Sequence, residues 1–154
     1  MRRLRGHVGA ALLTVAVLLA SWGGVGPGVA AECTRDDFFA TVDTAGAELR
    51  KLSSQNKPTF QAKLLALKQK RGWDHSTFLK HAAPLVQDEK IAAFDANARQ
   101  LLARLTRMGE EGGEQAKPDC NLLEELRRIM RELVAVQNAK WAYMFDRIDG
   151  ELAK

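Results

Sequence analysis

The residues of this sequence best suited to chemistry are its histidines, its adjacent acidic pairs and its cysteines. His75 and His81 are six positions apart, which puts them on opposite sides of one helix, whereas metal-binding histidines on a helix are three or four apart. Adjacent carboxyl groups such as Asp36 and Asp37 also lie on different helix faces, so stabilisation of a helix start explains them better than acid–base catalysis. We therefore predict no catalytic residue, no metal site and no cofactor.

Cys33 and Cys120 are the only cysteines. An even count in an exported chain favours a disulfide, and two buried free thiols are the alternative. Both cysteines lie just outside predicted helix starts, and such exposed positions suit a bridge better than a core. Because bridged Cα atoms lie within about 7 Å, the helices that follow the two cysteines must begin side by side and run parallel.

Residues 1–31 have the order of a secretory signal peptide. Three arginines precede an apolar run from Val8 to Ala20, and Val29-Ala30-Ala31 supplies the small residues expected before a cleavage site. The apolar run is shorter than the roughly 20 residues that span a bilayer, which argues against the alternative of a retained membrane anchor. The sequence predicts cleavage after Ala31, export to the bacterial periplasm or beyond, and a single domain over 32–154.

The segment from Arg50 to Arg71 holds seven basic residues and no acidic one. One interpretation is a docking surface for a protein or an anionic envelope component, with peripheral membrane contact included. The other is a solvated helix whose lysine stems cover apolar neighbours. Nucleic acid is a poor fit, because an exported protein rarely meets it and few aromatic residues interleave the charges. The residues assigned to the docking surface are Lys57, Lys63, Lys68, Lys70 and Arg71.

Apolar periodicity predicts helices and no strand. A stripe from Phe38 to Leu52 indicates a first helix that begins near Thr34 and ends at 53–56. Two short helices are expected between Pro58 and Ala83, with a break at Pro84. A long helix should follow from Leu85 to Met108, and the longest from Asp119 or Asn121 to about Leu152. The glycine-rich residues 109–118 are predicted to form a flexible linker.

Combined with the disulfide, these segments predict an all-α fold. Its three-helix core has parallel first and last helices and an antiparallel middle one. The short helices form a hairpin that caps the far end, where the last helix overhangs the first. The leading hypothesis is a non-enzymatic interaction module that binds through this basic cap. The alternative is a small-molecule binder or small helical enzyme whose pocket, between the cap and the last helix, is lined by Trp73, Phe78, Gln137, Trp141 and Phe145.

Overall fold

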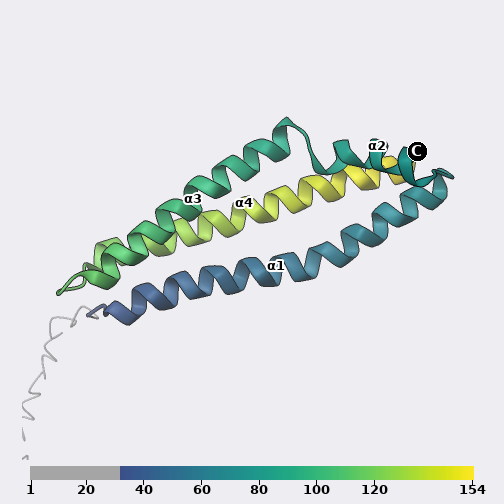
Figure 1. Ribbon diagram of the computed structural model, residues 1–154. Helices are drawn as coiled ribbons and strands as arrows, with labels where there is room; N and C mark the ends of the chain where they lie inside the picture. The colour runs from purple at the N-terminus through teal and green to yellow at the C-terminus, as the bar shows by residue number, and fades with distance from the viewer. Residues whose placement is uncertain (1–31) are drawn as a thin grey trace, which may run out of the picture. The chain divides into compact units, whose positions relative to one another are not determined.

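The computed structural model describes residues 32–154, and the predicted signal peptide lies outside the described residues. Within them the chain forms four helices and no strand: α1 (Arg35–Lys70), α2 (His75–Val86), α3 (Glu89–Glu114) and α4 (Cys120–Ala153). In Figure 1, α1 and α4 run the length of the bundle in the same direction, and α2 and α3 return one after the other. The predicted all-α class, with parallel first and last helices, is confirmed.

The predicted end of the first helix at 53–56 is wrong, because α1 continues through these residues and through Pro58 to Lys70. Pro58 removes the N–H that would donate to the carbonyl of Ser54, but both residues are exposed, so water can satisfy that carbonyl. There is consequently no separate helical hairpin at the far end. With 36 residues in α1 and 34 in α4, the last helix does not overhang the first.

The return path starts at Gly72, the predicted helix stop, whose φ of 63° lies in the left-handed region that glycine favours. Pro84 does not break α2, which ends at Val86 instead. The break falls two residues later, where Asp88 becomes the N-cap of α3 and accepts a hydrogen bond from the backbone N–H of Ile91 at 2.7 Å. Together α2 and α3 form one interrupted antiparallel arm.

The glycines of the predicted linker are part of a helix. α3 extends to Glu114, so only residues 115–119 connect it to α4. Gly109, Gly112 and Gly113 are buried, and α1 packs on them. A Cβ at Gly112 would lie 2.0 Å from ring carbons of Phe38, which no real contact permits. These glycines therefore allow close approach of two helices, and the prediction of a flexible linker is corrected.

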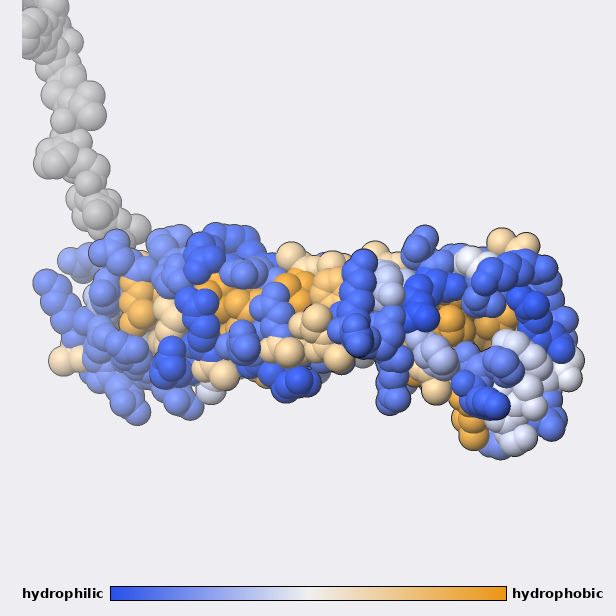
Figure 2. All heavy atoms as spheres, turned by 90° about the horizontal axis from the view of Figure 1, so that it is seen from above, coloured by the Kyte–Doolittle hydropathy of each residue, from blue (hydrophilic) through white to orange (hydrophobic). Residues whose placement is uncertain are grey.

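The core consists of two clusters of buried side chains, one at each end of the bundle. The first, which we call the disulfide half, is mainly aliphatic and comprises Phe38, Ala45, Ala98, Leu101, Leu105, Met108, Leu123, Leu126, Ile129 and Leu133. The second, the aromatic half, comprises Phe60, Leu67, Leu85, Ile91, Met144 and Ile148, with Trp73, Trp141 and Phe145 packed against it. Figure 2 shows apolar side chains reaching the surface between polar ones, including at the end where Figure 1 places α2.

Candidate functional site

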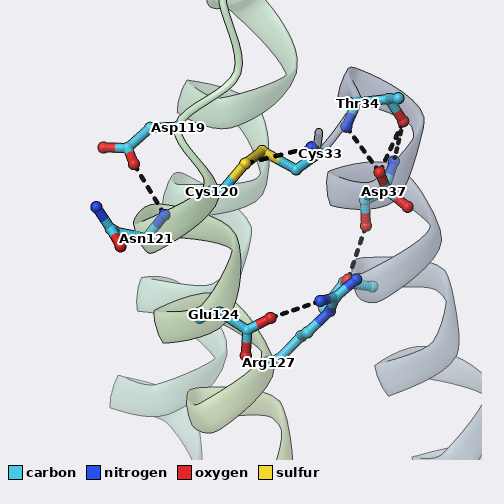
Figure 3. A network of polar contacts seen from close by, with 9 residues as sticks. Cys33, Thr34, Asp37, Asp119, Cys120, Asn121, Glu124 and Arg127 are labelled. Atoms are coloured by element: carbon cyan, nitrogen blue, oxygen red, sulfur yellow. Dashed lines mark hydrogen bonds and ion pairs between the residues drawn. A yellow bond between two sulfur atoms is a disulfide. The ribbon is translucent and has the colours of Figure 1, made fainter. Parts of the chain in front are cut away.

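The two cysteines form the predicted disulfide, with Cα atoms 5.4 Å apart at the starts of α1 and α4 (Figure 3). Beside it, Thr34 caps α1: its backbone N–H and hydroxyl donate to the Asp37 carboxylate at 2.7 and 2.8 Å. These bonds hold the pKa of Asp37 below its usual value. Asp119 caps α4 by accepting from the N–H of Asn121 at 2.9 Å. Cross-linking and capping explain this end of the molecule, and no thiol remains in residues 32–154 for chemistry.

Three residues of the predicted basic surface are engaged with the end of α4. Lys63 forms an ion pair with Asp149. Lys70 donates to the carbonyl of Leu152, and Arg71 donates to that of Glu151 at 3.1 Å while its guanidinium lies 3.5 Å from the Glu151 carboxylate. Cations at the last carbonyls of a helix satisfy unpaired acceptors and oppose the negative end of its dipole. Much of the basic character of α1 therefore serves the fold.

Lys57 and Lys68 lie on a different side of α1. At 100° per residue they are about 20° apart, and neither has an acidic partner among residues 32–154. On the same face, Gln61, Leu64 and Leu65 form with Phe78 of α2 a shallow cleft of about 340 Å³. The Lys68 ammonium lies 5.6 Å from the centre of the Phe78 ring. We call these six residues the basic–apolar face.

The apolar part of this face is open to solvent. Leu65 is 56% exposed, and Leu79, next to Phe78 in α2, is 55% exposed. Few leucines elsewhere in the described chain are as exposed, because the stripes of all four helices are otherwise turned inward. The basic–apolar face therefore combines unpaired positive charge with uncovered apolar side chains.

The five residues predicted to line one pocket are divided among separate places. Phe145 packs edge-on against Phe60 with ring centroids 5.6 Å apart, within the aromatic half. Phe78 belongs to the basic–apolar face, and Trp73 lies in a cleft between α2 and the ends of α1 and α4. Only Gln137 and Trp141 line the same hollow. The continuation of α1 contributes to this division, because Gln61, Leu64 and Leu65 of the continued helix line a cleft with Phe78.

The cleft at Trp73 holds about 440 Å³, but its charges are already paired. Arg71 is matched by Glu151, and Arg147 by Asp88. The His81 ring stacks on the Trp73 indole with centroids 4.8 Å apart, which gives this histidine a packing role. Within residues 32–154 no group of three or more histidine, cysteine or acidic side chains could hold a metal ion.

A polar cluster holds the start of α3 against α4. The Asp88 carboxylate accepts hydrogen bonds from the Tyr143 hydroxyl at 2.7 Å and from the Arg147 guanidinium. The backbone N–H of Ile91, the Tyr143 hydroxyl and the Arg147 charge together hold the pKa of Asp88 below its usual value. The same carboxylate, through its hydrogen bond and charge, raises the pKa of Tyr143. We call Asp88, Tyr143 and Arg147 the Asp88 cluster; its groups satisfy one another, which is typical of a structural role.

A hollow that the sequence did not predict as a unit lies in the middle of the bundle, between α1, α3 and α4. This central groove has a volume of about 350 Å³. Its apolar lining is Leu49, Leu52, Ala98, Leu102, Leu133 and Trp141, and its polar lining is Ser53, Asp95, Arg99, Gln137 and Lys140. The signal for this groove in the sequence was weak. It consisted of an amide at Gln137 in an apolar stripe, because the charged residues that Gln137 meets are distant in sequence.

Comparisons with known proteins found no matching family model, no similar curated protein and no similar solved structure. In residues 32–154, no helix combines the length and the apolar character needed to cross a membrane. Any functional assignment therefore rests on the geometry of the basic–apolar face and of the central groove.

Proposed function

We propose that this protein is a non-enzymatic interaction module of the bacterial periplasm or extracellular space, and that it docks on an anionic lipid surface through the basic–apolar face. The observation that carries the proposal is one face of α1 on which two lysines without acidic partners flank exposed apolar side chains. Anionic headgroups above acyl chains match both properties at once, whereas a polar polyanion would match only the lysines.

The compartment is part of the proposal. A disulfide between Cys33 and Cys120 persists in oxidising surroundings such as the periplasm or the cell exterior. The signal-like order of residues 1–31 points to the same destination. In that setting the outer surface of a bacterial membrane, rich in anionic lipid, is close to the protein.

The expected affinity is low. Each basic residue close to an anionic membrane contributes about 1 kcal/mol, so Lys57 and Lys68 give only about 2 kcal/mol. Insertion of Leu65 and Phe78 would add apolar transfer energy at about 25 cal/mol per Å² of buried area. Binding should therefore be reversible and should weaken with salt, because exposed charges are screened over about 8 Å at physiological ionic strength.

The test is co-sedimentation with phosphatidylcholine vesicles that contain or lack phosphatidylglycerol. We expect the protein to bind the anionic vesicles at low salt and the neutral ones much less. The double variant Lys57→Glu/Lys68→Glu should lose this binding, because both changes place negative charge beside the apolar cleft. Folding should be retained, since exposed substitutions usually change stability within about 0.5 kcal/mol.

The matched control is Lys51→Glu/Lys80→Glu, which alters net charge equally at two other exposed lysines. At 100° per residue, Lys51 is about 120° from Lys57 on α1, and Lys80 is about 160° from Phe78 on α2. This variant should keep most of the vesicle binding. Equal loss in both variants would mean that net charge, and not this face, drives adsorption. If the unaltered protein did not bind the anionic vesicles but captured an acidic protein from envelope extract, the lipid assignment would be overturned.

A further inference from the structure

The central groove lies where the packed core is interrupted. On one side, Leu49, Ala98 and Leu133 belong to the disulfide half, and on the other Trp141 belongs to the aromatic half. α1 and α3 are in close contact at the glycines near the end of α3, about 16–22 Å along the helix from Ala98 at 1.5 Å per residue. At Ala98 there is no glycine to allow this close approach. Side chains therefore separate α1 from α3 and leave room between them.

The polar groups of the groove are not all paired. Lys140 donates to Asp95 at 2.7 Å, and its side chain is only 20% exposed. Arg99 has no acidic partner in the described part of the chain, and the Gln137 side chain, which is not fully buried, is left open to solvent there. With Asp95 cancelled by Lys140, one positive charge remains at Arg99. The unmatched charge of the groove is therefore a single cation able to form bidentate hydrogen bonds.

The walls of the groove are suited to an apolar body. Leu102 is 46% exposed, although it is a large aliphatic side chain, and the half-buried Trp141 indole also belongs to the lining. A volume of about 350 Å³ lies at the lower end of the range for small-molecule pockets, 300–1,000 Å³. A ligand that covered this wall would need one or two rings, or a short alkyl chain, and one anionic group.

We propose that the central groove binds a small hydrophobic monoanion, an aromatic or short aliphatic carboxylate, whose carboxylate pairs with Arg99 and whose apolar body lies against Leu102 and Trp141. Gln137 is placed to donate its side-chain amide to the same anion. This site is separate from the basic–apolar face: the two share no lining residue. It differs too from the pocket predicted from the sequence, since it is formed with α3 and not with α2.

The experiment uses 1-naphthoate as the probe and 1-naphthalenemethanol as its neutral counterpart. In the mature protein, residues 32–154, with Trp73→Phe, Trp141 is the only indole, so its fluorescence reports the groove directly. We expect saturable quenching by naphthoate and about tenfold weaker binding of the alcohol, since a hydrogen bond to a charged group contributes about 1.5 kcal/mol or more. The side-chain amide signals of Gln137 should shift in NMR spectra with the same dissociation constant.

Arg99→Gln is the decisive variant, because Arg99 is exposed and its replacement should not disturb folding. It should weaken naphthoate binding about tenfold and leave binding of the alcohol unchanged. The matched control is Arg107→Gln, an exposed arginine on the same helix but outside the groove lining. Absence of saturable naphthoate binding, or equal affinity in the Arg99→Gln and unaltered proteins, would overturn the proposal. Lys57→Glu/Lys68→Glu should bind naphthoate normally, which keeps this outcome independent of lipid docking.

Discussion

The two halves of this bundle are held together by different means. The disulfide half has a covalent cross-link, an aliphatic core and glycines that bring α1 and α3 into close contact. Its one ion pair between helices is Arg104–Glu125. The aromatic half has no cross-link but contains the other ion pairs that join helices in residues 32–154, namely Lys63–Asp149, Arg71–Glu151, Lys140–Asp95 and Arg147–Asp88.

This difference follows from where the helices end. At the disulfide end, the starts of α1 and α4 are fixed by a bond and by N-caps. At the other end, the last carbonyls of α4 and the carbonyl of Pro84 near the α2–α3 break have no partner within their own helices. Polar side chains from neighbouring helices satisfy those groups. Partly exposed ion pairs contribute at most about 1 kcal/mol each, so the aromatic half should open more easily than the disulfide half.

The strongest test of this comparison removes the cross-link. Cys33→Ser/Cys120→Ser should lower the free energy of unfolding by about 4–5 kcal/mol in the chain-entropy model, because the bond closes a long loop; the two cysteines are 87 positions apart. Chemical denaturation followed by circular dichroism measures this loss. Helical content in buffer should change little, since the apolar stripes remain.

Hydrogen exchange shows where that stability is lost. In the cysteine-free variant, the backbone amides in the first turns of α1 and α4 should lose the most protection from exchange. The two halves would then have similar protection. If the aromatic half lost protection to the same extent, the molecule would unfold as one cooperative unit and the comparison would fail.

The second test concerns the glycines. Gly112→Ala places a Cβ against the fully buried ring of Phe38, at a distance that requires one helix to move. Overpacking of this kind costs about 1–3 kcal/mol, more than the gain of up to about 1 kcal/mol from replacing glycine in a helix. The thermal midpoint should therefore fall.

Gly150→Ala is the matched control for the glycine test. Gly150 is exposed in α4, and nothing lies within 4 Å of an added Cβ. This variant should be as stable as the unaltered protein or slightly more stable, by up to about 1 kcal/mol. Equal destabilisation by the two substitutions would show that close packing at Gly112 is not the cause.

These same glycines show why part of the fold could not be predicted from the sequence. Residues 109–118 have the composition of a linker. Most of this segment is helical because its glycines pack against Phe38 of α1, which is distant in sequence. The continuity of α1 through Pro58 is a similar case, because burial of Phe60 and Leu67, in the turns that follow, outweighs the local cost of proline. By contrast, the cysteines restricted the topology directly, and Asp119 was one of the two N-caps, with Asn121, that the local sequence predicted for the last helix.

The candidate sites illustrate the same limit. The count of charges identified the basic segment. It could not distinguish Lys57 and Lys68 from the lysines that contact α4, because this distinction depends on the positions of Asp149 and Leu152 in the folded protein. The central groove needed three helices to be placed before Arg99 could be associated with Gln137. Apart from the arrangement that the disulfide imposes, features that depend on contacts between elements were not predicted.

The smallest expected effect concerns the Asp88 cluster, which lies in the aromatic half. The pKa of Asp88 is lowered in the folded protein, so its stabilising contribution is present above the usual aspartate pKa and is lost as pH falls through the lowered value. Asp88→Asn keeps an oxygen for the N–H of Ile91 but loses the charge opposite Arg147. The variant should be less stable than the unaltered protein at neutral pH, and the difference in thermal midpoint should shrink on acidification below about pH 4.

Tyr143 provides a direct reporter of this cluster, because it is the only tyrosine in the chain. Its pKa is raised chiefly by the hydrogen bond to Asp88, so phenolate absorbance should develop above the usual value of about 10. The stabilising effect of the neutral phenol is present below that usual value and is lost as pH rises through the raised pKa. In Asp88→Asn the spectroscopic titration should move down toward the usual value, although burial of the ring keeps part of the shift. An unchanged tyrosine titration would mean that Asp88 does not hold α3 against α4 in solution, and the aromatic half would then depend on its apolar core and its other ion pairs.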